Sequence, residues 1–515
     1  MSKYYLGIEL GSTRIKSVLI DADTKVVAQG SHEWENSLVD GLWSYSLADV
    51  ESGLQESYRN MARDFEERLG TPLTRIEAIG ISAMMHGYLV FDKDDRLLVP
   101  FRTWRNTNTE AAADELSEAF GFNVPMRWSV SHYYQAVLNG EEHVSRVAFL
   151  TTLAGYVHYR LTGERVLGVG DASGMFPTDG MAYDKVMLEK LDKKLSDKGM
   201  DVSFESLLPR ILTAGDAAGR LTEAGASYLD PTGQLKSGAL LCPPEGDVGT
   251  GMVATNAVRQ RSANVSAGTS AFLMVALEKP LDSYYREIDV VASPVGDPVA
   301  MVHVNNFTTE ITAWANLFEE LVALAGGDIA RGKLFDLLYS KALDGDADCG
   351  ALMGYNFLAG EPVVGVKDGA VLMARSPEGT LTLANFMKMQ LYSALGALAI
   401  GCEMLKKEKV AIDSVCGHGG FFKAPLVGQR LMSAAIGAPV TIMKNAGEGG
   451  AWGIAVLALY AAVKDKSLAD FLDTVFAEAE KNTASATDAD LLDFGAFMKK
   501  FKSGIAVQKL AAEVL

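Results

Sequence analysis

Apolar runs separated by short polar turns fill the start of the chain and predict three strands, at residues 4–10, 15–21 and 26–30. The spacing of the apolar residues then changes from that of strands to that of a helix. Ser46 followed by Asp49 is typical of a helix start, and apolar residues spaced to fit one helical face follow it from Val50 to Leu69. Further strands are predicted at 76–82 and 89–92. Hairpins followed by alternating strand and helix indicate an α/β domain with a mixed sheet.

The second half of the chain repeats this order of elements. Strands are predicted at 265–267, 271–275, 288–293, 299–305, 410–416 and 440–444. Helices are predicted after Thr308 or Thr309, at 424–436, and at 449–463, where the nearly all-apolar composition indicates burial. The tail after residue 464 is predicted to be helical, with a polar loop at 482–490. The repetition predicts two domains, 1–252 and 253–515.

A glycine followed by hydroxyl residues forms the turn between two apolar runs in each half. The residues are Gly11, Ser12 and Thr13 in the first half, and Gly268, Thr269 and Ser270 in the second. Glycine lets the backbone bend and approach a ligand closely. The hydroxyl groups and the backbone N–H groups of such a turn can hold phosphate oxygens. Two such turns in one chain indicate two similar domains that hold one polyphosphate from both sides.

Charged residues accompany these turns. Glu9 precedes the first bend, where a carboxylate can hold Mg²⁺ directly or through water, and Lys16 closes the same motif on the phosphate side. Asp247 stands in the glycine-rich segment 244–251, ahead of the second turn. An aspartate between glycines is commonly a turn former. In this position it can also accept a hydroxyl proton during phosphoryl transfer, and it is the second candidate ligand for the metal.

Three residues after buried strands are candidates for binding a polyol. His86 follows the strand predicted at 76–82, and it is either a hydrogen-bonded core histidine or a polar group at the strand's end that points into a ligand crevice. Trp104 and Asn106 follow a later strand and would add an aromatic face and an amide. Small-ligand pockets generally combine apolar surface with a few fixed polar groups. The three residues therefore predict a sugar-binding side.

The segment 417–423 is predicted to be a strand-to-helix turn that seats an adenosine. Gly419 and Gly420 permit close approach, and a helix starting at Ala424 would offer free N–H groups, with Lys423 beside it. The alternative is a turn that only packs against its neighbours. The run 447–453 nearly matches a dinucleotide fingerprint, but Trp452 replaces its last glycine. The sequence contains no P-loop motif.

Composition narrows the class of protein. The 515 residues are 48% hydrophobic and 22% charged, which is typical of a globular protein. A net charge of −18 argues against nucleic acid or an anionic membrane as a partner, because both need a basic surface. The four cysteines are widely spaced and are expected to be isolated buried thiols. We find no secretory signal pattern, and the longest apolar run, 454–463, is about half a membrane span. We therefore expect a cytoplasmic protein.

The motifs together resemble the FGGY family of carbohydrate kinases. The ordered pieces are Gly-Ile-Glu-Leu-Gly-Ser-Thr, Ile-Gly-Ile-Ser-Ala-Met-Met-His-Gly, Tyr-Arg-Leu-Thr-Gly-Glu, Asp-Ala-Ser-Gly, Gly-Asp, Ala-Gly-Thr-Ser, Gly-Glu-Pro and Gly-His-Gly-Gly. The Met-His-Gly piece looks most like the xylulokinase branch. The resemblance implies an α/β protein of two RNase H-like domains, as in the actin/hexokinase superfamily. Their mixed sheets would surround a central cleft that binds ATP and Mg²⁺.

The resemblance also implies roles for individual residues. Asp247 would match the family's catalytic base, Met85 and His86 its sugar contacts, the two glycine-hydroxyl turns its phosphate hairpins, and Gly419 with Gly420 its adenosine turn. The chain departs from the usual pattern in places. Glu9 stands where the family usually has aspartate, and Met84 where it usually has glutamine.

The expected function is ATP-dependent phosphorylation of a sugar hydroxyl, with a ketopentose such as D-xylulose as the first candidate. Other sugars of the family remain alternatives, namely L-ribulose, L-fuculose, L-rhamnulose and glycerol. A nucleotide- or sugar-binding sensor with weak catalysis is a second class, and an ATPase with protein partners a third. The partner we expect is a small sugar, and the assembly we consider is a homodimer.

Overall fold

The computed structural model describes the chain except for residues 1–2, 425, 444–448 and 515. Its internal contacts divide it into two units. The first comprises Met1–Val258, Asp289–Val299 and Glu448–Glu478, and the second Arg259–Ile288, Ala300–Gly447 and Ala479–Leu515. The chain thus contributes late segments to the first unit, which a single cut after residue 252 does not describe. The boundary at 252/253 stays a prediction.

A mixed sheet in the order β13-β6-β1-β2-β3 forms the centre of the first unit, and β14 also pairs with β6. Its strands are β1 (Tyr5–Leu10), β2 (Arg14–Ile20), β3 (Val26–Glu33), β6 (Ala78–Ala83), β13 (Leu240–Leu241) and β14 (Glu245–Gly246). β1 and β3 are antiparallel to β2, whereas β6 is parallel to β1 and β13 and β14 are parallel to β6. The expected mixed sheet, which begins with antiparallel hairpins, is confirmed.

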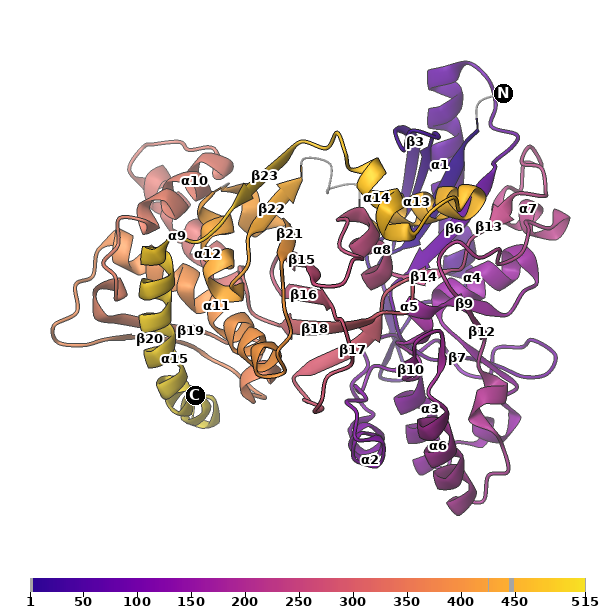
Figure 1. Cartoon of the computed structure of the whole chain (residues 1–515), viewed down its shortest axis with the longest axis horizontal. Coiled ribbons are helices and arrows are strands. Elements are labelled where there is room, and N and C mark those ends of the chain that lie inside the picture. The colour runs from indigo at the N-terminus through magenta and orange to yellow at the C-terminus, as the bar shows by residue number, and fades with distance from the viewer. Residues whose placement is uncertain (1–2, 425, 444–448, 515) are drawn as a thin grey trace. The chain divides into compact units, whose positions relative to one another are not determined.

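Helices make up much of the rest of the first unit. They are α1 (Leu47–Leu69), α2 (Glu110–Phe120), α3 (Ser129–Leu138), α4 (Leu153–Thr162), α5 (Val169–Ala172), α6 (Lys185–Asp197), α7 (Glu223–Leu229), α8 (Asp247–Ala254), α13 (Gly449–Val463) and α14 (Leu468–Val475). The predicted start of α1 is confirmed, since the Ser46 side chain accepts a hydrogen bond from the Asp49 N–H at 3.0 Å. Helix α13 is buried as its apolar composition predicts, and it lies on the sheet beside β6 (Figure 1).

Short strand pairs complete the first unit. They are β4 (Ser37–Val39) with β5 (Leu42–Ser44), β7 (Leu89–Phe91) with β8 (Phe149–Thr151), β9 (Val166–Gly168) with β12 (Arg210–Leu212), and β10 (Thr178–Asp179) with β11 (Ala182–Tyr183). The strand predicted at 89–92 therefore pairs outside the central sheet.

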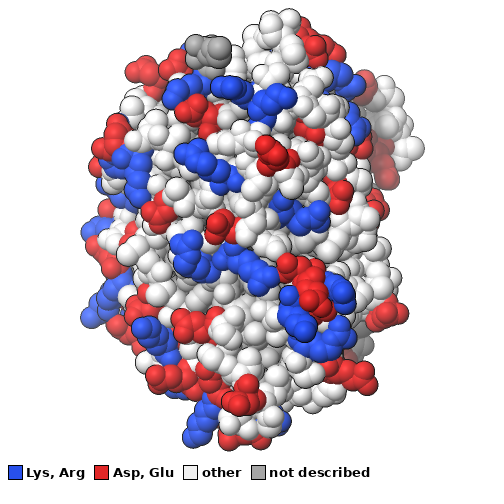
Figure 2. Space-filling view, turned by 90° about the vertical axis from the view of Figure 1, so that its right-hand side faces the viewer, with Lys and Arg blue, Asp and Glu red and all other residues white. Residues whose placement is uncertain are grey.

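On the face shown in Figure 2, basic and acidic side chains intermingle.

A second mixed sheet has the order β17-β18-β16-β15-β21-β22-β23. Its strands belong to the second unit, except for β17 after its first residue and the first two residues of β18, which belong to the first unit. The strands are β15 (Ser262–Ala267), β16 (Ala271–Ala276), β17 (Ile288–Ala292), β18 (Pro298–Val304), β21 (Ser414–His418), β22 (Val440–Met443) and β23 (Lys481–Ala484). The hairpin β19 (Leu352–Asn356) and β20 (Val371–Arg375) lies outside this sheet. Helices α9 (Thr309–Leu324), α10 (Arg331–Ala342), α11 (Leu383–Lys407), α12 (Val427–Ile436) and α15 (Asp488–Val514) accompany it.

Several boundaries in the second unit differ from the prediction. Helix α12 begins at Val427 rather than at residue 424, because Leu426 adopts a φ of 69° that a helix does not allow. Part of the loop predicted at 482–490 is strand β23, which pairs antiparallel with β22 and joins Thr483 to Thr441 through their hydroxyls at 2.8 Å. The strand predicted at 410–416 begins at Ser414. Residue 444, the predicted end of another strand, lies outside the described residues.

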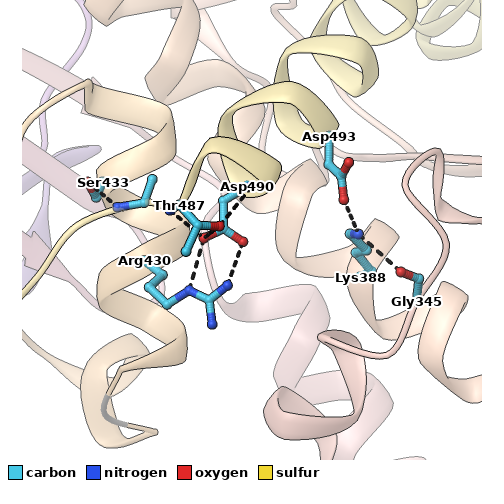
Figure 3. Close-up of polar contacts among 8 residues, drawn as sticks. Gly345, Lys388, Arg430, Ser433, Thr487, Asp490 and Asp493 are labelled. Atoms are coloured by element: carbon cyan, nitrogen blue, oxygen red, sulfur yellow. Dashed lines mark hydrogen bonds and ion pairs between the residues drawn. The ribbon is translucent and has the colours of Figure 1, made fainter.

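Ion pairs attach the last helix, α15, to α11 and α12, and Figure 3 shows two of them. Arg430 on α12 binds both oxygens of Asp490 at 2.9 Å, and Lys388 on α11 binds Asp493 at 2.8 Å. Burial alone would raise the pKa of the Asp490 carboxyl, but hydrogen bonds from Arg430 and from Thr487 outweigh that effect and hold the pKa below its ordinary value. These contacts fix the end of the chain on the second unit.

The cysteines are Cys242, Cys349, Cys402 and Cys416, and each is buried with a free thiol, as expected. Within the described residues, no helix is both long and apolar enough to cross a bilayer.

Candidate active site

The first glycine-hydroxyl turn joins β1 to β2 and is anchored through its carbonyl oxygens. Gly11 donates its N–H to the Arg14 carbonyl at 3.0 Å, and the Gly11 carbonyl accepts the Trp34 indole N–H at 2.7 Å. The Tyr45 hydroxyl bonds to the Ser12 carbonyl at 2.6 Å. Among the described residues, no hydrogen bond uses the N–H groups of Ser12 and Thr13. The turn therefore presents donors, which suits a phosphate.

Glu9 lies at the end of β1, and the sheet places Lys16 of β2 directly beside it. The first residues of α13 face the same carboxylate: a Cβ added at Gly450 would come within 2.3 Å of Glu9 Oε1. Burial raises the pKa of Glu9, while the charge of Lys16 and the Ala451 N–H at the start of α13 lower it. A carboxylate thus stands between a lysine and a helix N-terminus.

Asp247 is the first residue of α8, directly after the short strand β14. Its Oδ1 accepts the backbone N–H groups of Val248 at 3.1 Å and Met85 at 3.3 Å. The side chain is open to solvent, yet neighbouring protein atoms partly desolvate it. That desolvation and, next, the charge of Glu9 raise the pKa of Asp247 to about 6, while the two N–H groups lower it. A raised proton affinity makes this carboxylate a better general base.

Glu9 and Asp247 are close enough for the charge of one to shift the pKa of the other. Two carboxylates that repel each other at the end of a sheet suit a hard divalent cation, since Mg²⁺ is usually bound by one or two carboxylates together with phosphate oxygens and water. Among the described residues, no group of three or more His, Cys, Asp and Glu side chains is arranged to hold a metal alone. The pair therefore fits Mg²⁺ that arrives with a phosphate ligand.

His86 and Met85 follow β6. His86 is buried, with a φ of 69°, and its Nδ1 lies 3.0 Å from the carbonyl oxygen of Gly174. Burial and, next, the charge of Arg127 lower the pKa of His86 to about 3, so the imidazole is neutral near neutral pH. Because a carbonyl only accepts, Nδ1 carries the proton and Nε2 is left as an acceptor. Such an acceptor suits a sugar hydroxyl.

Trp104 and Asn106 lie on one loop but have different surroundings. The Trp104 side chain is exposed. Asn106 is buried: its Oδ1 accepts the Trp43 N–H at 2.8 Å, and its Nδ2 donates to the carbonyls of Trp43 at 2.9 Å and Thr103 at 3.0 Å. The amide thus braces the loop that carries Trp104. A contact of either residue with a sugar stays a prediction.

The second glycine-hydroxyl turn, in the second unit, is anchored in the same manner as the first. It joins β15 to β16, and Gly268 donates its N–H to the Ser270 carbonyl at 2.9 Å. The Gly268 carbonyl accepts from the Thr308 hydroxyl at 2.6 Å, and the Thr269 carbonyl accepts the Phe307 N–H at 2.8 Å. The segment before α9 thus donates hydrogen bonds to the carbonyl oxygens of this turn, as Trp34 and Tyr45 do for the first turn.

Gly419 lies against the end of β15, next to this turn. Its φ is 106°, and a Cβ there would come within 2.4 Å of the Ala267 carbonyl oxygen, so a side chain is excluded on both grounds. Gly420 begins a 3-10 turn that ends at Lys423, and Gly420 and Lys423 are exposed. The helix expected at Ala424 is wrong here, since α12 begins at Val427. N–H groups of a helix start are therefore not offered at residue 424.

The structure thus brings the predicted residues into two sets, one in each unit. The first set contains Glu9, Gly11, Ser12, Thr13, Lys16, Met85, His86, Trp104, Asn106 and Asp247, and the second contains Gly268, Thr269, Ser270, Gly419, Gly420 and Lys423. What each residue binds stays a prediction.

Sequence reasoning missed two buried carboxyl groups beside Asp247. Asp171 and Glu245 are buried, and burial raises the pKa of Asp171 to about 7 and that of Glu245 to about 8. The Asp-Ala-Ser-Gly piece contains Asp171, and Glu245 stands two residues before Asp247, but neither has a sequence signature of burial. The glycines at 168, 170 and 249 were the available signal, because they leave room for a side chain.

Glu361, in the second unit, leads to an expected pH dependence of stability. Burial raises the pKa of its carboxyl from 4.5 to about 7, although N–H groups of Asn306 and Asn305 lower it. A folded-state pKa above the unfolded one means that the native state holds the extra proton. The stabilisation is therefore complete below about pH 4.5 and is lost as pH rises through about 7.

We expect the free energy of unfolding to decline across that range, and to decline less in Glu361→Gln. Urea unfolding of both proteins at a series of pH values measures the difference. Glu378→Gln, at an exposed position of the same unit, is the control and should follow the wild type. Identical pH profiles for wild type and Glu361→Gln would contradict the assignment.

The chain matches family models over most of its length. Residues 4–230 match the N-terminal domain of the FGGY family of carbohydrate kinases, and residues 263–462 match the C-terminal domain of the same family.

Known proteins match at modest identity. The chain is 24% identical over 343 residues to a xylulose kinase of Haemophilus influenzae, covering 62% of this chain and 66% of that protein. It is 25% identical over 203 residues to a gluconokinase of Bacillus subtilis, covering 36% of this chain and 38% of that protein. The matched part thus spans less than two thirds of either relative.

A solved structure, the ligand-bound xylulose kinase of Lactobacillus acidophilus, superimposes with a TM-score of 0.80 at 16% identity and covers 98% of each chain. This likeness establishes the fold, and the expected α/β architecture of two mixed sheets is confirmed.

Proposed function

Because the chain belongs to the FGGY family of carbohydrate kinases, we propose that it transfers the γ-phosphoryl group of ATP to a hydroxyl of a small sugar. D-xylulose is the first candidate acceptor, since a xylulose kinase is among the relatives. The observation that carries the proposal is the carboxylate of Asp247, with its raised pKa, bonded to the N–H of Met85 next to neutral His86.

In the proposed reaction Asp247 accepts the proton of the acceptor hydroxyl while that oxygen forms a bond to the γ-phosphorus and the bond to ADP breaks. His86 Nε2 accepts a hydrogen bond from another hydroxyl and orients the sugar. The N–H groups of the two glycine-hydroxyl turns hold phosphate oxygens, and Lys16 adds a positive charge. Glu9 and Asp247 would hold Mg²⁺, which when bound offsets the charge of the phosphate oxygens.

The surroundings of His86 favour a neutral sugar over a sugar acid. The charge of Arg127 reaches His86, as its effect on the histidine pKa indicates. That guanidinium is already paired with Asp289, whose other oxygen accepts a hydrogen bond from Asn123 at 2.8 Å. A gluconate carboxylate would therefore compete with Asp289 for Arg127, whereas a ketopentose or a polyol would not.

A panel of acceptors with ADP release as the readout tests the proposal. The acceptors are D-xylulose, L-ribulose, L-fuculose, L-rhamnulose, glycerol and gluconate. We expect sugar-stimulated ADP release with the highest kcat/KM for D-xylulose. A higher value for another acceptor would replace D-xylulose within the same reaction class. If no acceptor raised ADP release above the rate without sugar, the kinase proposal would fail and a sensor that binds without catalysis would take its place.

We place the protein in the cytoplasm as part of this proposal, because the substrate ATP is abundant there. The homodimer stays a prediction.

A further inference from the structure

Glu245 is a buried glutamate whose side chain lies in space left by three glycines. A Cβ added at Gly168 would come within 2.1 Å of Glu245 Oε1, and one at Gly170 within 2.3 Å of Glu245 Oε2. A Cβ at Gly249 would lie 3.1 Å from Oε2. The Glu245 side chain is 1% exposed. Three glycines around one carboxyl group indicate that the surrounding backbone leaves this space for the Glu245 side chain.

The carboxyl group binds the start of the short helix α5. Glu245 Oε2 accepts the Asp171 N–H at 3.1 Å. Asp171 is held from another side as well, since the Thr152 hydroxyl donates to its Oδ2 at 2.6 Å. The backbone of the two segments is joined too, by the Gly168 N–H and the Pro244 carbonyl at 2.8 Å. Glu245 therefore sets where α5 lies relative to the segment that carries Asp247.

The turn after α5 reaches the sugar-side residues. The Gly174 carbonyl contacts His86 Nδ1 at 3.0 Å. A Cβ at Gly174 would come within 2.7 Å of that nitrogen and 2.8 Å of Met85 Cε, so the histidine and methionine pack directly on this backbone. Whatever displaces α5 will therefore displace His86.

The contacts close into a ring that returns to Asp247. Met85 donates its N–H to Asp247 Oδ1 at 3.3 Å, and its Cγ would lie 2.1 Å from a Cβ at Gly246, the residue between Glu245 and Asp247. The ring runs from Asp247 through Met85 and His86 to Gly174, then along α5 to Glu245 and back. Each of these residues belongs to the first unit.

We infer that Glu245 is a positioning residue that fixes the general base Asp247 relative to the sugar-binding residue His86. Its side chain extends into the space left by the three glycines and accepts a hydrogen bond there. It does not contact the substrate. The inference rests on the proposed kinase function, because that function gives Asp247 and His86 their roles in phosphoryl transfer.

The test compares three variants that separate the length of the side chain from its charge. In Glu245→Ala the Asp171 N–H loses its acceptor and α5 is released, so we expect kcat to fall about 10- to 100-fold and the KM for sugar to rise by a similar factor. The KM for ATP should stay within about twofold, since the phosphate turns are not part of the ring.

Glu245→Gln has the length of glutamate and keeps an acceptor for the Asp171 N–H, so it should restore kcat and the sugar KM to within about threefold of wild type. Glu245→Asp keeps the charge but is one methylene shorter, so it should resemble the alanine variant. Glu164→Ala, at an exposed position of the same unit, is the control for a lost glutamate. Thermal unfolding of each variant records whether it is folded under the assay conditions.

The outcomes distinguish this inference from the function on which it rests. If wild type shows no sugar-dependent ADP release, the kinase proposal fails. If wild type is active and folded Glu245→Ala has unchanged kcat and sugar KM, the positioning role is overturned. It is also overturned if Glu245→Gln is as impaired as Glu245→Ala, or if all kinetic constants, including the KM for ATP, change together. Should the alanine variant not fold, the contrast between Gln and Asp still decides.

Discussion

Replacing Asp247 with asparagine should lower kcat by about 10²- to 10⁴-fold while ATP binding stays near the wild-type level. Asparagine keeps the size of the side chain and can still accept the N–H groups of Val248 and Met85 that position it. It cannot take the proton of an attacking hydroxyl. The loss should therefore appear in kcat measured by coupled ADP release, whereas calorimetric titration with ATP in the absence of Mg²⁺, which Asp247 would help to hold, should give a similar Kd.

Asp201→Asn serves as the control for this experiment, because Asp201 is exposed in the same unit and contacts none of the ring around Asp247. Asp247→Ala adds the loss of the hydrogen bonds and should be no more active than the asparagine variant. Turnover of Asp247→Asn within a few-fold of wild type would remove Asp247 from the role of general base.

Local patterns were sufficient to predict much of the fold. Apolar runs between short polar turns located β1 and β2, and the hydroxyl of Ser46 located the start of α1, because each signal depends on residues within a few positions of one another. The two glycine-hydroxyl turns were predictable for the same reason. Both occur in the structure as sheet turns whose carbonyl oxygens are anchored from outside.

Contacts between distant segments could not be predicted from the sequence pattern. Strand β23 has a polar sequence, and it becomes a strand because β22 offers it an edge to pair with. The burial of Glu245 depends on Gly168 and Gly170, which lie far from it in sequence. Helix α13 was predicted as a buried helix, but nothing in its composition assigns it to the first unit or brings its start to Glu9.

The contact that brings α13 to Glu9 is also a place where a small substitution should cost considerable stability. Gly7 is in the middle of β1, and a Cβ there would come within 2.0 Å of the Ala451 carbonyl oxygen and 2.6 Å of the Ala455 N–H nitrogen. Both are helix backbone atoms that cannot rotate away as a side chain can. Gly7→Ala therefore has to separate the strand from the helix.

We expect Gly7→Ala to lower the free energy of unfolding by about 3 kcal/mol, at the upper end of the usual cost of overpacking a core. Because the start of α13 lies beside Glu9, kcat should fall as well. Gly495→Ala on α15 is the matched control: no atom lies within 4 Å of the added methyl group, so stability should be unchanged or rise by up to about 1 kcal/mol. Urea unfolding of wild type and the two variants measures both changes in the free energy of unfolding. Equal stability of wild type and Gly7→Ala would show that strand and helix are not in contact at this position, and Glu9 would then lose the N–H group that lowers its pKa.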